Sequence, residues 1–129
     1  MIPPANHASN PLAYIVDDEP MLLDLNESVL RTMGFEVKRF RAAERAYEAY
    51  RAELVKPAII VTDFSMHKMT GLDLIEACRT LNPDQKILLV SGTVDASAFA
   101  HAIEQPDHFL LKPYATDEFT AVVQNLTRK

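Results

Sequence analysis

Five polar side chains in this sequence come at, or directly after, the ends of short apolar stretches. Asp17 and Asp18 follow the first stretch, Asp63 ends a later one, and Ser91 and Lys112 follow two more. Apolar stretches of this length, rich in β-branched residues, are typical of strands buried on both faces of a parallel sheet. Because open α/β sheets bind ligands outside the carboxyl ends of their strands, we expect the five side chains to lie together.

The chemistry of such a group is the acceptance of a phosphoryl group. Three carboxylates held within a few ångströms repel one another, so a cation is needed to keep them all ionised. Oxygen ligands without a Cys/His cluster favour magnesium, which keeps water molecules that can exchange for a phosphate oxygen. Asp63 would be the nucleophile, Lys112 and the metal would neutralise the equatorial oxygens, and Ser91 would bind one of them.

Each of these residues also has an ordinary structural interpretation. An Asp-Asp pair before a helix commonly caps it, as Asp17 and Asp18 could do here. Asp63 could form a turn, and Lys112-Pro113 could be an ordinary loop. The joint placement of these residues at strand ends favours the functional interpretation.

The elements that must position these side chains alternate along the chain. Alternating strands and helices with right-handed crossovers imply a doubly wound, flavodoxin-like α/β fold. We predict a five-stranded parallel sheet of order 2-1-3-4-5, with the weak second strand at an edge and Asp17, Asp18 and Asp63 at the switch point. The predicted strands are Leu12–Val16, Phe35–Phe40, Ala58–Asp63, Ile87–Val90 and His108–Leu111, and the predicted helices are Pro20–Met33, Ala42–Leu54, Gly71–Leu81, Asp95–Glu104 and Thr116–Leu126.

The helix Pro20–Met33 carries apolar residues on more than one side. Leu23 and Leu30 lie roughly 90° from the stripe predicted to be buried, so we expect them to be only partly covered. A kinase-docking patch is one interpretation of these two residues, although single exposed apolar residues are common. The stripe predicted to be buried consists of Leu22, Leu25, Val29 and Met33.

Length and composition predict one soluble domain. The chain has 129 residues, of which 48% are hydrophobic and 24% charged. No apolar run approaches the roughly 18 residues that a membrane span needs. Residues 1–11 carry three prolines and are predicted to be a flexible lead-in, and residues 12–129 are predicted to form the domain.

Charge and cysteine content restrict the compartment and the partners. The formal net charge of -5 and the absence of a Lys/Arg cluster argue against direct binding to nucleic acid. The amino terminus lacks the pattern of a secretory signal, and one cysteine cannot form an internal disulfide. We therefore expect a cytoplasmic protein, with Cys78 in its core.

These residues resemble the receiver domains of two-component response regulators, over nearly the whole chain from residue 12 to residue 126. The specific parts are Val16-Asp17-Asp18-Glu19, Asp63 followed by Met66, Met69 and Gly71, Ser91-Gly92, and Phe109 three residues before Lys112-Pro113.

The resemblance implies a role for each matched residue. Asp63 would take a phosphoryl group from a phosphohistidine on a sensor histidine kinase or a phosphotransfer protein. Asp18, Asp63 and the backbone carbonyl of Ser65 would hold magnesium directly, and Asp17 mainly through water. Ser91 and Phe109 would be the switch pair, the hydroxyl moving to the phosphoryl group and the ring turning inward behind it. The Lys-Pro bond at this place is typically cis in the family, so the resemblance implies a cis Lys112-Pro113 bond.

The sequence also departs from the family pattern at several positions. His67 stands where such domains often have proline, and Phe109 stands where they often have tyrosine. Ser65 and Thr93 occupy positions that tune the lifetime of the phosphoryl group in the family.

Three other functions remain open at this point. Phosphatases of the haloacid dehalogenase class also use a strand-end aspartate and magnesium, but their pattern has a second aspartate where this chain has Ser65. A flavodoxin-like binding module is disfavoured because Asp17, Asp18 and Glu19 would repel a flavin phosphate. A docking module independent of phosphorylation is disfavoured because the acid, serine and lysine set is complete.

We therefore expect a signalling switch, not a conventional turnover enzyme, with at most self-phosphorylation and autodephosphorylation at Asp63. The chain ends just past its last predicted helix, so its output is expected through a downstream protein partner or through the output domain of a longer protein. The sequence names no kinase, stimulus or target.

Overall fold

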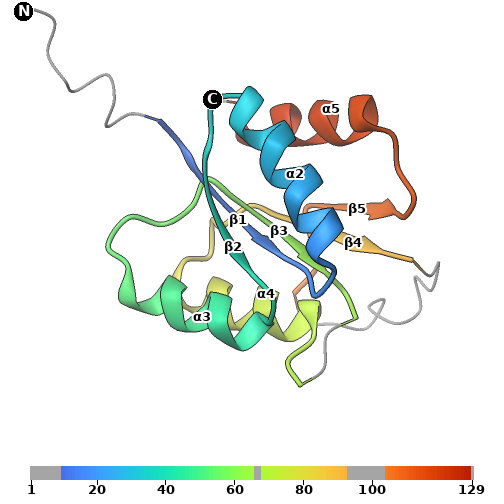
Figure 1. Cartoon of the computed structure of the whole chain (residues 1–129). Coiled ribbons are helices and arrows are strands. Elements are labelled where there is room, and N and C mark those ends of the chain that lie inside the picture. Colours follow the sequence, from blue (N-terminus) through green and yellow to red (C-terminus); the bar gives the residue numbers. More distant parts are fainter. Residues whose placement is uncertain (1–9, 66–67, 93–103, 129) are drawn as a thin grey trace, which may run out of the picture.

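The computed structural model of the chain describes residues 10–65, 68–92 and 104–128. Strands and helices alternate through most of this part of the chain, as predicted (Figure 1). The predicted helix 95–104, except for its last residue, and most of the predicted lead-in 1–11 lie outside the described residues. The elements are β1 Leu12–Val16, α2 Pro20–Thr32, β2 Glu36–Phe40, α3 Ala43–Ala52, β3 Ile59–Asp63, α4 Gly71–Leu81, β4 Ile87–Ser91, β5 His108–Leu111 and α5 Thr116–Thr127.

The strands form one parallel sheet of order β2-β1-β3-β4-β5, which confirms the predicted order. The three central strands are almost wholly buried, because both of their faces are covered by helices. The edge strand β2 exposes charged side chains at three of its five positions, and charges on an edge strand oppose pairing with another chain.

The core has two layers, one on each face of the sheet, because successive side chains of a strand point to opposite faces. Ala13 and Ile15 pack on the side of α2 and α5, whereas Tyr14 and Val16 pack on the side of α3 and α4. Figure 1 shows α2 and α5 together on one face and α3 and α4 on the other. Cys78 is buried in the second layer, as predicted.

Helix α2 buries a different stripe from the predicted one. Leu23 and Leu30 are fully buried, whereas Leu25 is 49% exposed. The prediction for these residues, and with it the docking patch at Leu23 and Leu30, was therefore wrong. The buried stripe includes the polar residue Asn26 together with Leu23 and Leu30.

The ends of the helices follow local chemistry. Pro20 occupies the start of α2, where its missing N–H costs nothing. Gly34 follows this helix with a φ of 99°, a left-handed conformation that glycine adopts without strain. Thr70 and Asp73 form a capping box that begins α4 beside the end of β3.

The layer on the side of α3 and α4 holds polar groups with contrasting surroundings. The Tyr50 hydroxyl donates to Gln85 Oε1 at 2.7 Å. Among the described residues, the buried Tyr14 hydroxyl has no hydrogen-bond partner. Burial raises the pKa of the Cys78 thiol to about 12, against the opposing charge of Lys56, so this thiol is a core group and not a reactive one.

In the part of the chain that the structure describes, every helix falls short of the length and hydropathy that a bilayer span requires.

Candidate functional site

The sheet brings the predicted site residues to one edge. Asp17 directly follows β1, and Asp63 and Ser91 are the last residues of β3 and β4. Lys112 directly follows β5, and its backbone N–H donates to the carbonyl of Ser91 at 2.7 Å. Because parallel strands end at the same edge, the four residues meet there, as the sequence predicts.

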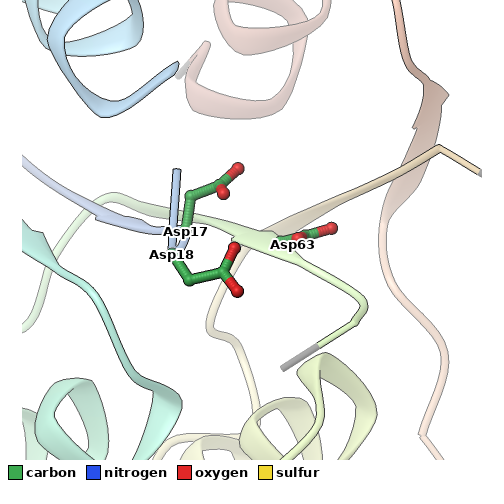
Figure 2. A group of neighbouring side chains, drawn as sticks. All are labelled: Asp17, Asp18 and Asp63. Carbon is green, nitrogen blue, oxygen red and sulfur yellow. The ribbon is translucent and has the colours of Figure 1, made fainter. Parts of the chain in front are cut away.

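Three carboxylates form the centre of this edge. Asp17, Asp18 and Asp63 each place a carboxylate oxygen within 4.8 Å of the others. Figure 2 shows their side chains next to one another, with Asp17 and Asp18 in the loop after β1 and Asp63 at the end of β3. Asp17 and Asp63 are only 3% and 6% exposed. Because the three carboxylates repel one another where little water screens them, the cluster favours binding of a cation.

The pKa of the Asp63 carboxyl is raised. Burial is the main cause, and the neighbouring Asp17 and Asp18 add to the rise, while Lys112 and the backbone N–H of Ser65 oppose it. The folded chain therefore holds this carboxylate at a cost in free energy, which a bound cation would relieve.

Lys112 supplies the positive charge that the described residues bring to this cluster. Its Nζ lies 3.1 Å from Asp17 Oδ2, 3.4 Å from Glu19 Oε1 and 3.6 Å from Asp63 Oδ1. Burial alone would lower the pKa of Lys112, but the hydrogen bond and charge of Asp17, helped by Asp63 and Glu19, raise it. The side chain is therefore an ammonium at neutral pH. The Lys112-Pro113 bond is cis, as predicted.

Asp17 serves both as a turn residue and as a member of the cluster. Its Oδ1 accepts from the Glu19 backbone N–H at 2.9 Å, and its Oδ2 accepts from Lys112. The N-cap of α2 is Glu19, which makes no side-chain capping bond. The capping interpretation thus accounts for one oxygen of Asp17 and leaves the other directed at the cluster.

The donor set fits magnesium. Carboxylate oxygens at this spacing are the hard ligands that this ion prefers, and a small number of protein ligands leaves positions for water or phosphate. Ser65 lies beside the cluster, because its backbone N–H bonds to the Asp63 carboxylate. Its carbonyl as a metal ligand stays a prediction.

The two predicted switch residues occupy different surroundings. Ser91 is buried at the end of β4. Phe109 is half-buried, pairs with Leu89 across β4 and β5, and packs against the layer on the side of α3 and α4. Their coupled movement stays a prediction, and Met66, His67 and Thr93 lie outside the described residues.

Three residues near the site were given no contact with the site residues in the sequence-based prediction. Glu19 contacts the Lys112 ammonium. Asn26 and Tyr114 form a hydrogen-bonded pair beside the loop that carries Lys112. A polar residue at helical spacing between Leu23 and Leu30 was the available signal for Asn26.

Gly71, at the start of α4, lies against the backbone of Asp63. A Cβ at this position would lie 2.6 Å from the Asp63 carbonyl oxygen and 2.7 Å from Leu89 Cδ1. The first distance is to a backbone atom, which cannot move without moving the acidic residue. The absence of a side chain at Gly71 therefore lets α4 begin directly behind the site.

We expect Gly71→Ala to lower the free energy of unfolding by about 1–3 kcal/mol, the usual cost of overpacking. Gly92→Ala is the matched control, because a Cβ there would have no atom of the described residues within 4 Å. Urea denaturation of the two variants and the parent measures the difference. Equal stability of the two variants would show that the chain relaxes around Gly71 at no cost.

The chain is similar to known proteins over almost all of its length. A family model described as the response regulator receiver domain matches residues 13–124. The transcriptional regulatory protein PrrA of Mycobacterium leprae is 30% identical over 122 residues, which are 94% of this chain and 52% of PrrA. The C4-dicarboxylate transport transcriptional regulatory protein DctD of Rhizobium meliloti is 28% identical over 92% of this chain and 26% of DctD. The chain thus spans about a quarter to a half of the length of these relatives.

A solved structure has the same fold. The response regulator receiver protein from Sinorhizobium medicae WSM419 superimposes with a TM-score of 0.84 and 25% identity, over 93% of this chain and 96% of that protein. The strand order, the acidic cluster with its lysine, and the family match agree. This chain belongs to the response regulator receiver domain family of two-component signal transduction.

Proposed function

We propose that this receiver domain accepts a phosphoryl group on Asp63, that the reaction requires magnesium, and that the modified site changes the surface offered to a partner. The observation that supports this most is the Lys112 ammonium, which lies between Asp17 and Asp63 within a cluster of three carboxylates. An acidic cluster with one half-buried cation beside it is suited to a transferred phosphoryl group.

In the proposed step, an Asp63 carboxylate oxygen attacks the phosphorus of a phosphohistidine. The new O–P bond forms as the P–N bond to the imidazole breaks, and the imidazole leaves with the bonding pair and takes up a proton. Lys112 neutralises an equatorial oxygen of the transferred group, and Ser91 donates a hydrogen bond to another. Asp18, Asp63 and the Ser65 carbonyl would hold magnesium, with Asp17 acting through water, and the bound ion would supply the remaining positive charge.

The raised pKa of Asp63 supports this role. Burial and the two neighbouring carboxylates destabilise the charge of Asp63, while Lys112 partly offsets them. A carboxylate whose charge is destabilised in this way is a stronger base, and so a better nucleophile, than a solvated one.

The proposed output begins at Ser91 and Phe109. A hydroxyl drawn to the phosphoryl group would open space that the Phe109 ring fills, and the exposed side of β5 would change with it. The partner would be a downstream protein or the output domain of a longer chain. PrrA and DctD are named as transcriptional regulatory proteins, and a target in transcription is part of this proposal.

An apolar hollow of about 550 Å³ beside Lys112 supports docking of a donor protein. Met21 is 83% exposed and Leu25 49% exposed at its rim. An amphipathic helix carrying the phosphohistidine would cover these side chains and bring its imidazole next to Asp63. The donor is therefore proposed to be a sensor histidine kinase or a phosphotransfer protein, in a cytoplasmic relay. The hollow is lined by Glu19, Met21, Leu22, Leu25, Lys112, Pro113 and Tyr114.

Intact-mass measurement after incubation with acetyl phosphate tests the proposal. We expect one lasting phosphoryl adduct that requires magnesium and is absent in Asp63→Asn. Repeated hydrolysis of acetyl phosphate without an adduct would instead indicate a phosphatase of the haloacid dehalogenase type. That function is disfavoured, since the exposed Ser65 cannot serve as the general acid that an aspartate provides. The absence of both adduct and hydrolysis would indicate a docking module.

A further inference from the structure

Helix α2 and the loop after β5 are joined by a polar pair, the buried Asn26 and the half-buried Tyr114. The Asn26 amide nitrogen donates to the Tyr114 hydroxyl at 3.0 Å, and this hydroxyl lies 3.3 Å from the Asn26 amide oxygen, to which it can donate. Asn26 is only 4% exposed. Among the described residues, Asn26 and Tyr114 are the only side-chain hydrogen-bond partners of one another, so each depends on the other to satisfy its polar group.

The surroundings hold this pair in one arrangement. Asn26 lies between the buried Leu23 and Leu30 on α2. The Tyr114 ring stacks on Phe119 of α5, with a centroid distance of 5.5 Å and an interplanar angle of 14°. Because an apolar layer offers no other partner, shifting the loop along α2 would break the hydrogen bond and leave the amide unsatisfied.

The Tyr114 hydroxyl stays protonated and able to donate. Burial raises its pKa, and Asp17 and Asp63 add to the rise, while Asn26 and Lys112 oppose it. The charges of Asp17 and Asp63 thus act on the Tyr114 hydroxyl as well as on Lys112.

Tyr114 is two residues from Lys112, so fixing the tyrosine restricts where the lysine ammonium can reach. The ammonium itself contacts Asp17, Glu19 and Asp63. In the proposed function, two of these residues change their contacts: Asp17 and Asp63 act on the metal ion, and Asp63 also takes the phosphoryl group. The Asn26–Tyr114 bond uses none of them, so it can hold the loop before and after the reaction.

We propose that Asn26 and Tyr114 are positioning residues, which fix the loop 112–114 against α2 so that the Lys112 ammonium meets the phosphoryl group on Asp63. The inference rests on the proposed function, because it assigns the pair to the lysine that the proposed function uses. It adds a link between that lysine and the helix on which the donor is proposed to dock.

Tyr114→Phe tests this, with Tyr50→Phe as the matched control. Both changes remove one hydroxyl that bonds to a buried amide side chain, but the Tyr50 bond to Gln85 lies in the other layer of the core. The probe is beryllofluoride, which stands in for the phosphoryl group, and its affinity in saturating magnesium is measured by calorimetry. Magnesium alone is titrated in parallel, because its proposed ligands do not include Lys112.

We expect both variants to lose stability, and only Tyr114→Phe to bind beryllofluoride more weakly, by about tenfold. Its affinity for magnesium alone should stay within about twofold of the parent. Equal beryllofluoride affinities in Tyr114→Phe, Tyr50→Phe and the parent would overturn the inference and leave the proposed function intact. Failure of the parent and of Tyr50→Phe to bind the probe would overturn the proposed function, and the inference with it.

The double variant Asn26→Leu/Tyr114→Phe separates positioning from stability. In the double variant, leucine replaces the Asn26 amide that Tyr114→Phe leaves without a partner. The midpoint of urea denaturation should therefore return toward that of the parent. Beryllofluoride affinity should remain about tenfold reduced, because two apolar groups do not fix the register of the loop. Recovery of affinity together with stability would assign the pair to stability alone.

Discussion

Asp63→Asn is expected to abolish the phosphoryl adduct and, without metal, to raise the free energy of unfolding by about 1–2 kcal/mol. Two carboxylates about 5 Å apart at an effective dielectric constant of about 20 repel by about 3 kcal/mol. The ammonium of Lys112, 3.6 Å from Asp63, offsets part of this repulsion. Asparagine keeps the shape of the side chain and removes its charge.

The stabilisation depends on pH with a definite sign. The pKa of Asp63 is raised in the folded chain, so ionisation of this group costs folding free energy. The cost is absent below the unfolded pKa, near 3.8, and it develops as the pH rises through the folded pKa. The advantage of Asp63→Asn should therefore vanish in acid and be complete once the pH is above the folded pKa of Asp63.

Magnesium should remove the difference in stability between Asp63→Asn and the parent. The ion binds the folded site and stabilises it by mass action, and the variant has lost a direct ligand. The two curves of stability against magnesium should converge at millimolar concentrations. Urea denaturation measures both effects, and Asp84→Asn, an exposed position, controls for the change in net charge. A metal-free variant less stable than the parent would make Asp63 a structural turn residue.

Lys112→Ala is expected to preserve the fold and to uncouple phosphorylation from the altered surface. The ammonium is the group that joins the transferred oxygen to the end of β5. Charge-assisted contacts of this kind are strong, so we expect beryllofluoride to bind at least tenfold more weakly. Asp63 can still be modified, because the nucleophile and the metal ligands remain.

Amide hydrogen exchange checks the uncoupling. With beryllofluoride and magnesium at saturating concentration, the parent should show altered exchange between residues 104 and 112, and Lys112→Ala should show little. Lys86→Ala removes an exposed lysine away from the site and serves as the control. A saturated Lys112→Ala variant with the exchange pattern of the parent would remove the proposed role of this lysine.

The arrangement of strands and the site followed from the sequence for a physical reason. A buried parallel strand must be apolar throughout, so the first polar residue marks its end. Asp17, Asp63, Ser91 and Lys112 were found in this way, and the strand order brought them together.

The rotation of α2 did not follow from the sequence. Counting apolar residues favoured Leu22, Leu25 and Val29 as the buried stripe, because Asn26 was counted as polar. The helix instead buries Asn26 with Leu23 and Leu30, since Tyr114 satisfies the amide. That partner is 88 positions away, and no local pattern contains it.

Glu19 illustrates the same limit. Its position after the two aspartates was evident, but its contact with Lys112 joins residues that are 93 positions apart. Such a contact depends on how the loop after β5 folds, which is decided by packing against α2 and α5.

The division of α2 into a buried and an exposed face bears on how this protein can evolve. Leu23, Asn26 and Leu30 maintain the core, whereas Met21 and Leu25 lie largely in solvent. Substitutions at exposed positions away from special contacts usually change stability by no more than about 0.5 kcal/mol. After a gene duplication, a copy could therefore acquire a new phosphodonor through changes at Met21 and Leu25 alone, while its fold and its reaction chemistry stay under separate selection.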